Sequence, residues 1–162
     1  MRKRKGFLIL RILFAVLPIV LLIQNYGTTI RIWLHPVTTT IGQIAPALPD
    51  KEITALTFIP GNDAEKEFRI TGDDDLSDLI TRLSSLQIKE KTKGDSKGYD
   101  KSDSIFLGVQ SGLRVILDVS EDRTELLLAK VSKDKTTTRW YSVLNQEEME
   151  RIMSLIREKK TD

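Results

Sequence analysis

The clearest structural signal in the chain is the stretch IFLGVQSGLRVILDV at residues 105–119. Apolar residues occupy every second position on each side of Ser111-Gly112, which is the alternation of strands with one buried face. Ser-Gly is a dipeptide typical of tight turns. The stretch therefore predicts an antiparallel hairpin, and the alternation points Asp118 to the face opposite its neighbours Leu117 and Val119.

Two further strands follow the hairpin. Residues 124–131 and 137–143 have the composition of strands and are joined by the polar segment 132–136. Because consecutive strands usually pair with each other, the four strands predict an antiparallel meander. Trp140 and Tyr141 are adjacent on the last strand and point to opposite faces, so we expect one of them in the core.

A second hairpin and a helix precede this meander. Residues 53–59 and 67–71 read as strands on either side of the turn sequence PGND at 60–63. Residues 73–86 then predict a helix that opens at Gly72 and the cap residue Asp73. Its apolar side chains fall on one stripe, formed by Leu76, Leu79, Ile80, Leu83 and Leu86.

The last element is an amphipathic helix that begins after Asn145. Asn145 and Glu148 have the spacing of a capping box, and Leu144 can pack on Met149 as a hydrophobic staple. The sequence thus predicts an α+β fold of order ββαββββα, with a mainly antiparallel sheet and both helices packed on one face. Residues 89–104, which contain no aliphatic side chain, are predicted to form a solvated loop.

The N-terminus predicts a membrane anchor. Residues 1–5 form a basic tail, and residues 6–23 are apolar except for Arg11, which can extend to the headgroups. The positive-inside rule places the tail in the cytoplasm, so the chain is expected at the cell membrane as a single-pass protein with its folded domain outside. The alternatives are a buried helix and a cleaved signal peptide, although Asn25-Tyr26-Gly27 is a poor cleavage site.

The remaining chain divides into a tether and a domain. Residues 24–49 are expected to be a membrane-proximal tether, with a second span over 28–48 as the alternative. Residues 50–162 are expected to fold as one extracytoplasmic domain, large enough to bury its own core. This domain holds 19 basic residues and all 23 acidic residues, a net charge of −4, which argues against nucleic acid as a partner.

The residues give little sign of catalysis, and we expect no enzyme activity, catalytic residue, cofactor or metal. The chain has no cysteine, and its one histidine, His35, lies outside the predicted domain. A serine-lysine dyad needs a buried lysine, whereas the lysines here lie in loops and at helix ends. The acidic cluster Asp73–Asp78 lacks the spacing of a calcium loop and suits the first turn of a helix.

The long loop is the place where a partner contact is predicted. Tyr99 is its one large apolar group, flanked by the charged residues Lys97 and Asp100, and could bury an aromatic face against a protein at the cell surface. The alternative, a solvated insertion without a role, stays open.

The layout resembles the small membrane-anchored ectodomains of unknown function from Gram-positive bacteria. The resemblance rests on the basic start and anchor, on Ile70-Thr71 before the first helix, and on the sequence WYSV at 140–143 before the last. It implies a membrane-anchored extracytoplasmic binding or regulatory module of unknown ligand. The alternatives are an assembly subunit of a membrane protein complex and, with less support, an enzyme.

Overall fold

The computed structural model describes residues 16–27, 29, 31–32, 34–46, 48, 53–92, 101–109 and 114–160. The chain forms two compact units, Met1–His35 and Pro36–Asp162. In the first unit, residues 16–27 are helical. Within the described part of the chain, no helix is both long and apolar enough to cross a bilayer. Residues 6–15 of the predicted anchor lie outside the described residues, so the transmembrane helix remains a prediction.

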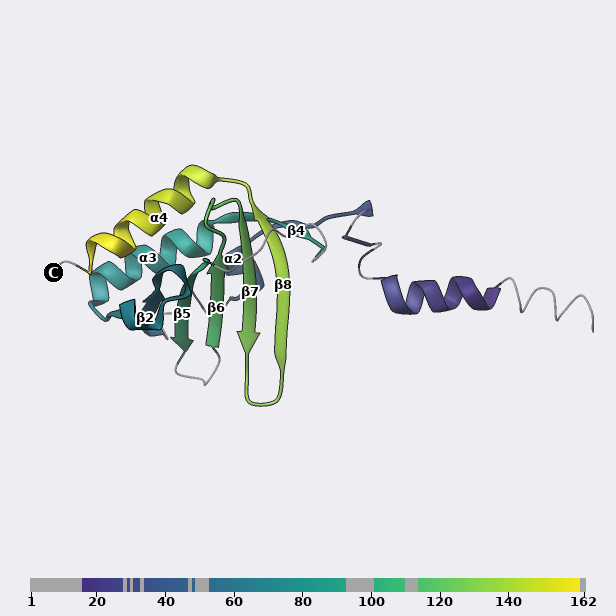
Figure 1. Ribbon diagram of the computed structural model, residues 1–162, viewed down its shortest axis with the longest axis horizontal. Coiled ribbons are helices and arrows are strands. Elements are labelled where there is room, and N and C mark those ends of the chain that lie inside the picture. The colour runs from purple at the N-terminus through teal and green to yellow at the C-terminus, as the bar shows by residue number, and fades with distance from the viewer. Residues whose placement is uncertain are drawn as a thin grey trace, which may run out of the picture. The chain divides into compact units, whose positions relative to one another are not determined.

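The second unit is an α+β structure built on one eight-stranded antiparallel sheet (Figure 1). Its strands are β1 Thr38–Thr40, β2 Ile53–Ile59, β3 Phe68–Ile70, β4 Gln87–Lys91, β5 Asp103–Val109, β6 Arg114–Val119, β7 Glu125–Val131 and β8 Thr136–Val143. Its α-helices are α2 Ile41–Ile44, α3 Asp73–Ser85 and α4 Gln146–Glu158, and two short 3-10 helices, η1 Pro60–Asn62 and η2 Ala64–Lys66, connect β2 to β3. Across the sheet the strands run in the order β1-β4-β8-β7-β6-β5-β2-β3.

The predicted meander is confirmed. Strands β5, β6, β7 and β8 are consecutive neighbours, and Ile105 lies opposite Leu117 on the first pair. The earlier hairpin is confirmed as well, because β2 pairs with β3. Its turn contains Gly61 and Asn62, both with φ of 58°, a left-handed conformation that glycine and asparagine accept more readily than other residues.

Helices α3 and α4 lie together on one face of the sheet, as predicted, and α2 packs beside α3 (Figure 1). Their apolar stripes meet the inward side chains of the strands in a single core. Tyr141 is buried in this core, whereas its neighbour Trp140 is half-buried on the opposite face. The expected division of the Trp-Tyr pair between the two faces is therefore confirmed.

The predicted order ββαββββα is wrong in one respect, because the sheet has two more strands. Strand β4 occupies residues 87–91, partly within the segment predicted as a solvated loop, and pairs with β8. Only Ile88 supplies an apolar side chain to its inner face. The next inward position is the buried Glu90, which forms an ion pair of 2.6 Å with Arg139. An ion-paired glutamate in an inward position removes the apolar alternation by which a strand is recognised.

The other additional strand comes from the predicted tether. Strand β1 pairs with β4, and α2 follows it directly. Thr40 and Gln43 form a capping box around the first turn of α2. Ile41, Ala45 and Leu48 are buried in the core. The second half of the expected 24–49 tether is therefore part of the folded unit.

The start of α4 also differs from the predicted capping box. Asn145 is the N-cap residue, but its side chain makes no capping hydrogen bond. Its Oδ1 atom instead accepts a hydrogen bond of 3.0 Å from the backbone N–H of Gln87. Glu148 accepts a hydrogen bond of 2.9 Å from Arg82 on α3, and Leu144 is exposed rather than stapled. The polar side chains at this helix start thus join α4 to α3 and β4.

Candidate functional site

The face of the sheet that is turned away from α2, α3 and α4 carries a band of apolar side chains. Strand register places Phe106 opposite Ile116, Ile116 opposite Ala129, and Leu127 opposite Trp140. All five side chains are half-buried. We call the surface formed by Phe106, Ile116, Leu127, Ala129 and Trp140 the open face. Partly exposed apolar side chains that adjoin one another are typical of surfaces that contact a ligand or another protein.

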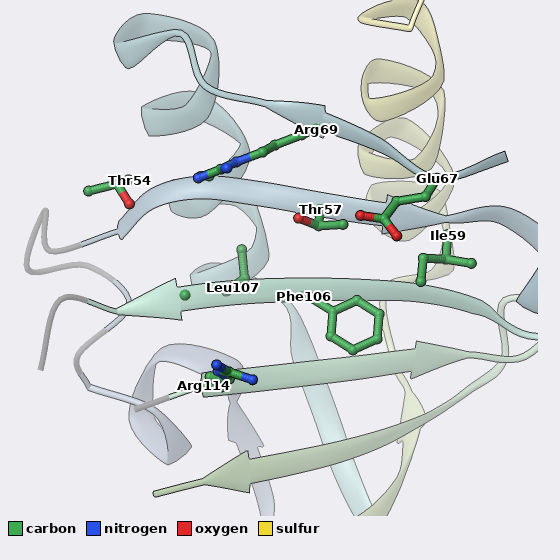
Figure 2. A pocket seen from close by; sticks show the side chains of 10 residues that line it. Thr54, Thr57, Ile59, Glu67, Arg69, Phe106, Leu107 and Arg114 are labelled. Carbon is green, nitrogen blue, oxygen red and sulfur yellow. The ribbon is translucent and has the colours of Figure 1, made fainter. Parts of the chain in front are cut away.

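A pocket of about 450 Å³ lies at one end of this face, over strands β3, β2, β5 and β6 (Figure 2). This volume is within the range of sites that hold small molecules. The pocket is lined by Thr54, Ala55, Thr57, Ile59, Glu67, Arg69, Phe106, Leu107, Gly108 and Arg114.

The hollow exists because two neighbouring positions on adjacent strands carry almost no side chain. Ala55 lies opposite Gly108, and a bulge between Ile53 and Ala55 interrupts the regular pairing of β2 with β5. A Cβ atom added at Gly108 would meet no atom within 4 Å. Two larger side chains border this hollow. Phe106 lies two residues before Gly108 on β5, and Arg114 lies opposite Gly108 on β6.

Charge is distributed unevenly in the pocket. Arg69 and Arg114 are exposed, and within the described part of the chain neither side chain forms a hydrogen bond or an ion pair. Glu67 is the one acidic residue of the described lining. Figure 2 shows the Arg69 side chain extending toward Thr54, away from Glu67. The pocket thus has a cationic end and an anionic end, with Phe106 and Ile59 as its apolar walls.

A second polar cluster is buried on the other side of the sheet, around Asp103. The Asp103 carboxylate accepts hydrogen bonds from the Gly61 backbone N–H at 2.7 Å, from Arg123 at 2.6 Å and from Arg157 at 3.0 Å. Arg123 also donates to the Ser120 carbonyl at 3.1 Å and has a left-handed backbone with φ of 60°. These bonds join the β2–β3 turn, the β6–β7 turn and the end of α4, which is a structural role.

The structure describes only some of the residues that the sequence predicted to be functional. Tyr99, Lys97 and Asp100 lie outside the described residues, so their predicted partner contact stays a prediction. In the acidic cluster at the start of α3, Asp75 forms an ion pair with Lys159 at 2.8 Å and Asp78 with Arg82 at 2.9 Å. Among the residues that the structure describes, no group of three or more His, Cys, Asp or Glu could hold a metal ion.

The pocket residues were missed by the sequence analysis, although part of the signal was present. Arg69 lies between two apolar residues of a predicted strand, and Arg114 lies beside Val115, so alternation places both arginines on the outer face. The pairing of β2 with β5 then brings the β2–β3 hairpin and the β5–β6 hairpin together. No local pattern in the sequence indicates that pairing.

Comparison with known proteins adds no relative from which residues could be transferred. No protein-family model, no curated protein and no solved structure matches this chain. The residues of the pocket and their arrangement are therefore the basis for assigning a function.

Proposed function

We propose that the protein is a binding or regulatory module, anchored in the cell membrane by a single N-terminal helix and displaying its folded unit outside the cytoplasm. The observation that carries the proposal is the pocket on the open face. It combines a hollow of small-molecule size with two arginines that have no partner in the described chain. Concave sites with a few convergent polar groups among apolar ones are the usual form of a ligand site.

The membrane part of the proposal rests on the first residues. The basic tail Arg2–Lys5 precedes the apolar segment 6–23, a distribution that favours a cytoplasmic N-terminus. The helical residues 16–27 support an anchor, because they expose large apolar side chains such as Leu17, Ile19 and Ile23 by more than half of their surface. Lipid rather than water is the natural surrounding of such a surface.

Binding is favoured over catalysis by the chemistry of the described lining. It offers one carboxylate, Glu67, and no imidazole, thiol or amine that could act as a nucleophile or a matched general base. Among the described residues, the hydroxyl groups of Thr54 and Thr57 form no hydrogen bond with a carboxylate or another base. The guanidinium groups of Arg69 and Arg114 are hydrogen-bond donors without an acceptor atom, so they can bind an anion but offer no group that accepts a proton from a substrate.

A second function, an assembly subunit of a membrane protein complex, is favoured by the apolar band of the open face. Ile116, Leu127 and Trp140 lie beyond the pocket, and a small ligand in the pocket would leave them uncovered. Aromatic and aliphatic side chains of this kind are enriched at the centres of protein interfaces.

Site-specific photocrosslinking of the full chain in its native membrane tests the proposal. The photoreactive residue p-benzoylphenylalanine is placed at position 106, and a matched variant carries it at the exposed position 150 of α4. We expect an adduct at position 106 and none at position 150, and the mass of the adduct distinguishes a small ligand from a protein. Absence of an adduct at position 106 would contradict the binding function.

The topology has its own test. Protease added to intact spheroplasts should digest the folded unit, because the positive-inside rule places it outside the membrane. Disruption of the spheroplasts serves as the control for protease activity. Protection of the folded unit until the membrane is broken would contradict the single-pass arrangement.

A further inference from the structure

The arginines of the folded unit fall into two groups. All but two of those described form an ion pair with a carboxylate, and these paired residues are Arg82, Arg123, Arg139, Arg151 and Arg157. Arg69 and Arg114 are the exceptions within the described residues, and both line the pocket. Because residues 50–162 carry a net charge of −4, acidic partners are not scarce in this part of the chain.

The two arginines without an ion pair also lie on opposite sides of the same hollow. Arg114 lies opposite Gly108, and Arg69 lies opposite Thr57 on the far side of the same hollow. Two guanidinium groups that line one cavity give it a positive potential, which attracts an anion. Guanidinium groups bind carboxylates and phosphates through paired N–H donors, which makes an oxyanion the matching ligand group.

The rest of the pocket limits what the oxyanion can be attached to. Phe106 and Ile59 offer apolar contact, and the volume of about 450 Å³ accommodates a small organic molecule. Glu67 repels a second negative charge at its end of the pocket. We therefore infer that the pocket binds a small organic anion, with its carboxylate or phosphate between Arg69 and Arg114 and its apolar part against Phe106. This inference rests on the proposed binding function and specifies its ligand class.

The inference is tested by titrating the full chain, purified in a non-ionic detergent, with defined probes. 3-Phenylpropionate carries the carboxylate, phenyl phosphate carries the phosphate, and 3-phenylpropanamide is the neutral counterpart of the first. Chemical shifts of backbone amides and of arginine Nε–H groups report both binding and its location. We expect saturable shifts at the pocket with one or both anions, a Kd of about 1 mM or tighter, and binding of the amide at least about tenfold weaker.

Four variants give a pattern that a general change in stability would not produce. Arg69→Gln and Arg114→Gln should each weaken anion binding about tenfold, the scale of one lost charge-assisted hydrogen bond. Glu67→Gln should strengthen it about threefold, because it removes a like charge near a solvated site. Arg151→Gln removes the same charge from the far side of the sheet and should leave affinity unchanged.

The variant Gly108→Val tests the contribution of the pocket's shape to binding separately from that of its charge. The added side chain enters open space and suits a strand, so the variant should fold, yet it fills the hollow between the two intact arginines. Anion binding should then be lost. The inference is overturned if the amide binds as well as the acid, if the arginine variants bind like Arg151→Gln, or if no anion gives saturable shifts. A negative titration together with a position-106 adduct would refute only the anionic ligand class, whereas failure of both would refute the binding function.

Discussion

The buried carboxylate of Asp103 allows a demanding test of the fold. Replacing Asp103 by asparagine preserves the shape of the side chain and the oxygen that accepts from Gly61. It removes the negative charge that faces Arg123 and Arg157. The side chains of Asp103 and Arg123 are 6% and 9% exposed, so the substitution leaves a nearly buried guanidinium without a carboxylate.

The expected loss follows from the burial of each partner. Removing one member of a buried ion pair costs about 3–5 kcal/mol, because the remaining charge stays desolvated. Arg157 is 53% exposed, so its ion pair with Asp103 contributes less than about 1 kcal/mol. Asp103→Asn should therefore lower the free energy of unfolding by about 3–5 kcal/mol, a large share of the 5–15 kcal/mol of an ordinary domain.

Guanidinium chloride unfolding, followed by circular dichroism, measures these free energies. Arg157→Gln is the control for the exposed partner and should lose less than about 1 kcal/mol. Combining Asp103→Asn with Arg123→Met should recover part of the loss, because the unpaired buried charge is removed. The reasoning is refuted if Asp103→Asn costs no more than Arg157→Gln, or if the double variant is no more stable than Asp103→Asn alone.

Three other expectations concern the packing and the charges of the folded unit. Gly42→Ala should lower stability by about 1–3 kcal/mol in the same unfolding assay, since its Cβ would lie 3.0 Å from the carbonyl oxygen of Ser84. Leu79→Ala, at a position 2% exposed in α3, should cost about 2–5 kcal/mol, and a smaller loss would show that the helix stripe is less tightly packed than described. The hydrogen bond from Lys66 lowers the pKa of Asp63 below the ordinary 3.8, so the stabilisation by this pair is present above pH 3.8 and is lost as the pH falls through the lowered pKa. Carboxyl NMR titration should show this low midpoint, and Lys66→Met should return it toward the ordinary value.

Much of the fold could be predicted because local patterns report local burial. The alternation over residues 105–143 and the stripe of α3 are set by which side chains face the core, and the meander and the helices follow from them. Strands β1 and β4 were not predicted because they lack the alternating apolar side chains by which a strand is recognised. The residues of β1 are three threonines, and β4 directs the ion-paired Glu90 inward. Their strand character depends on pairing with each other and with β8.

The candidate site was harder to predict because it depends on contacts between distant residues. Asp103 reads as a loop residue in sequence, and its burial is offset by arginines that lie 20 and 54 residues away. Arg69 and Arg114 come from different hairpins, which meet only through the pairing of β2 with β5. Alternation predicts the face on which each arginine lies but not which other strands share that face.

The incorporation of β1 and α2 into the folded unit determines where the chain can be cut without damage to the sheet. Strand β1 covers the outer edge of β4, where Val37 accepts a hydrogen bond of 2.9 Å from Glu90, and Ile41 and Leu48 fill the core beneath it. A protease that cut after Leu48 would leave unpaired backbone groups along β4, and such edges invite strand-to-strand aggregation. A fragment that keeps β4 covered therefore has to include β1, as the compact unit Pro36–Asp162 does.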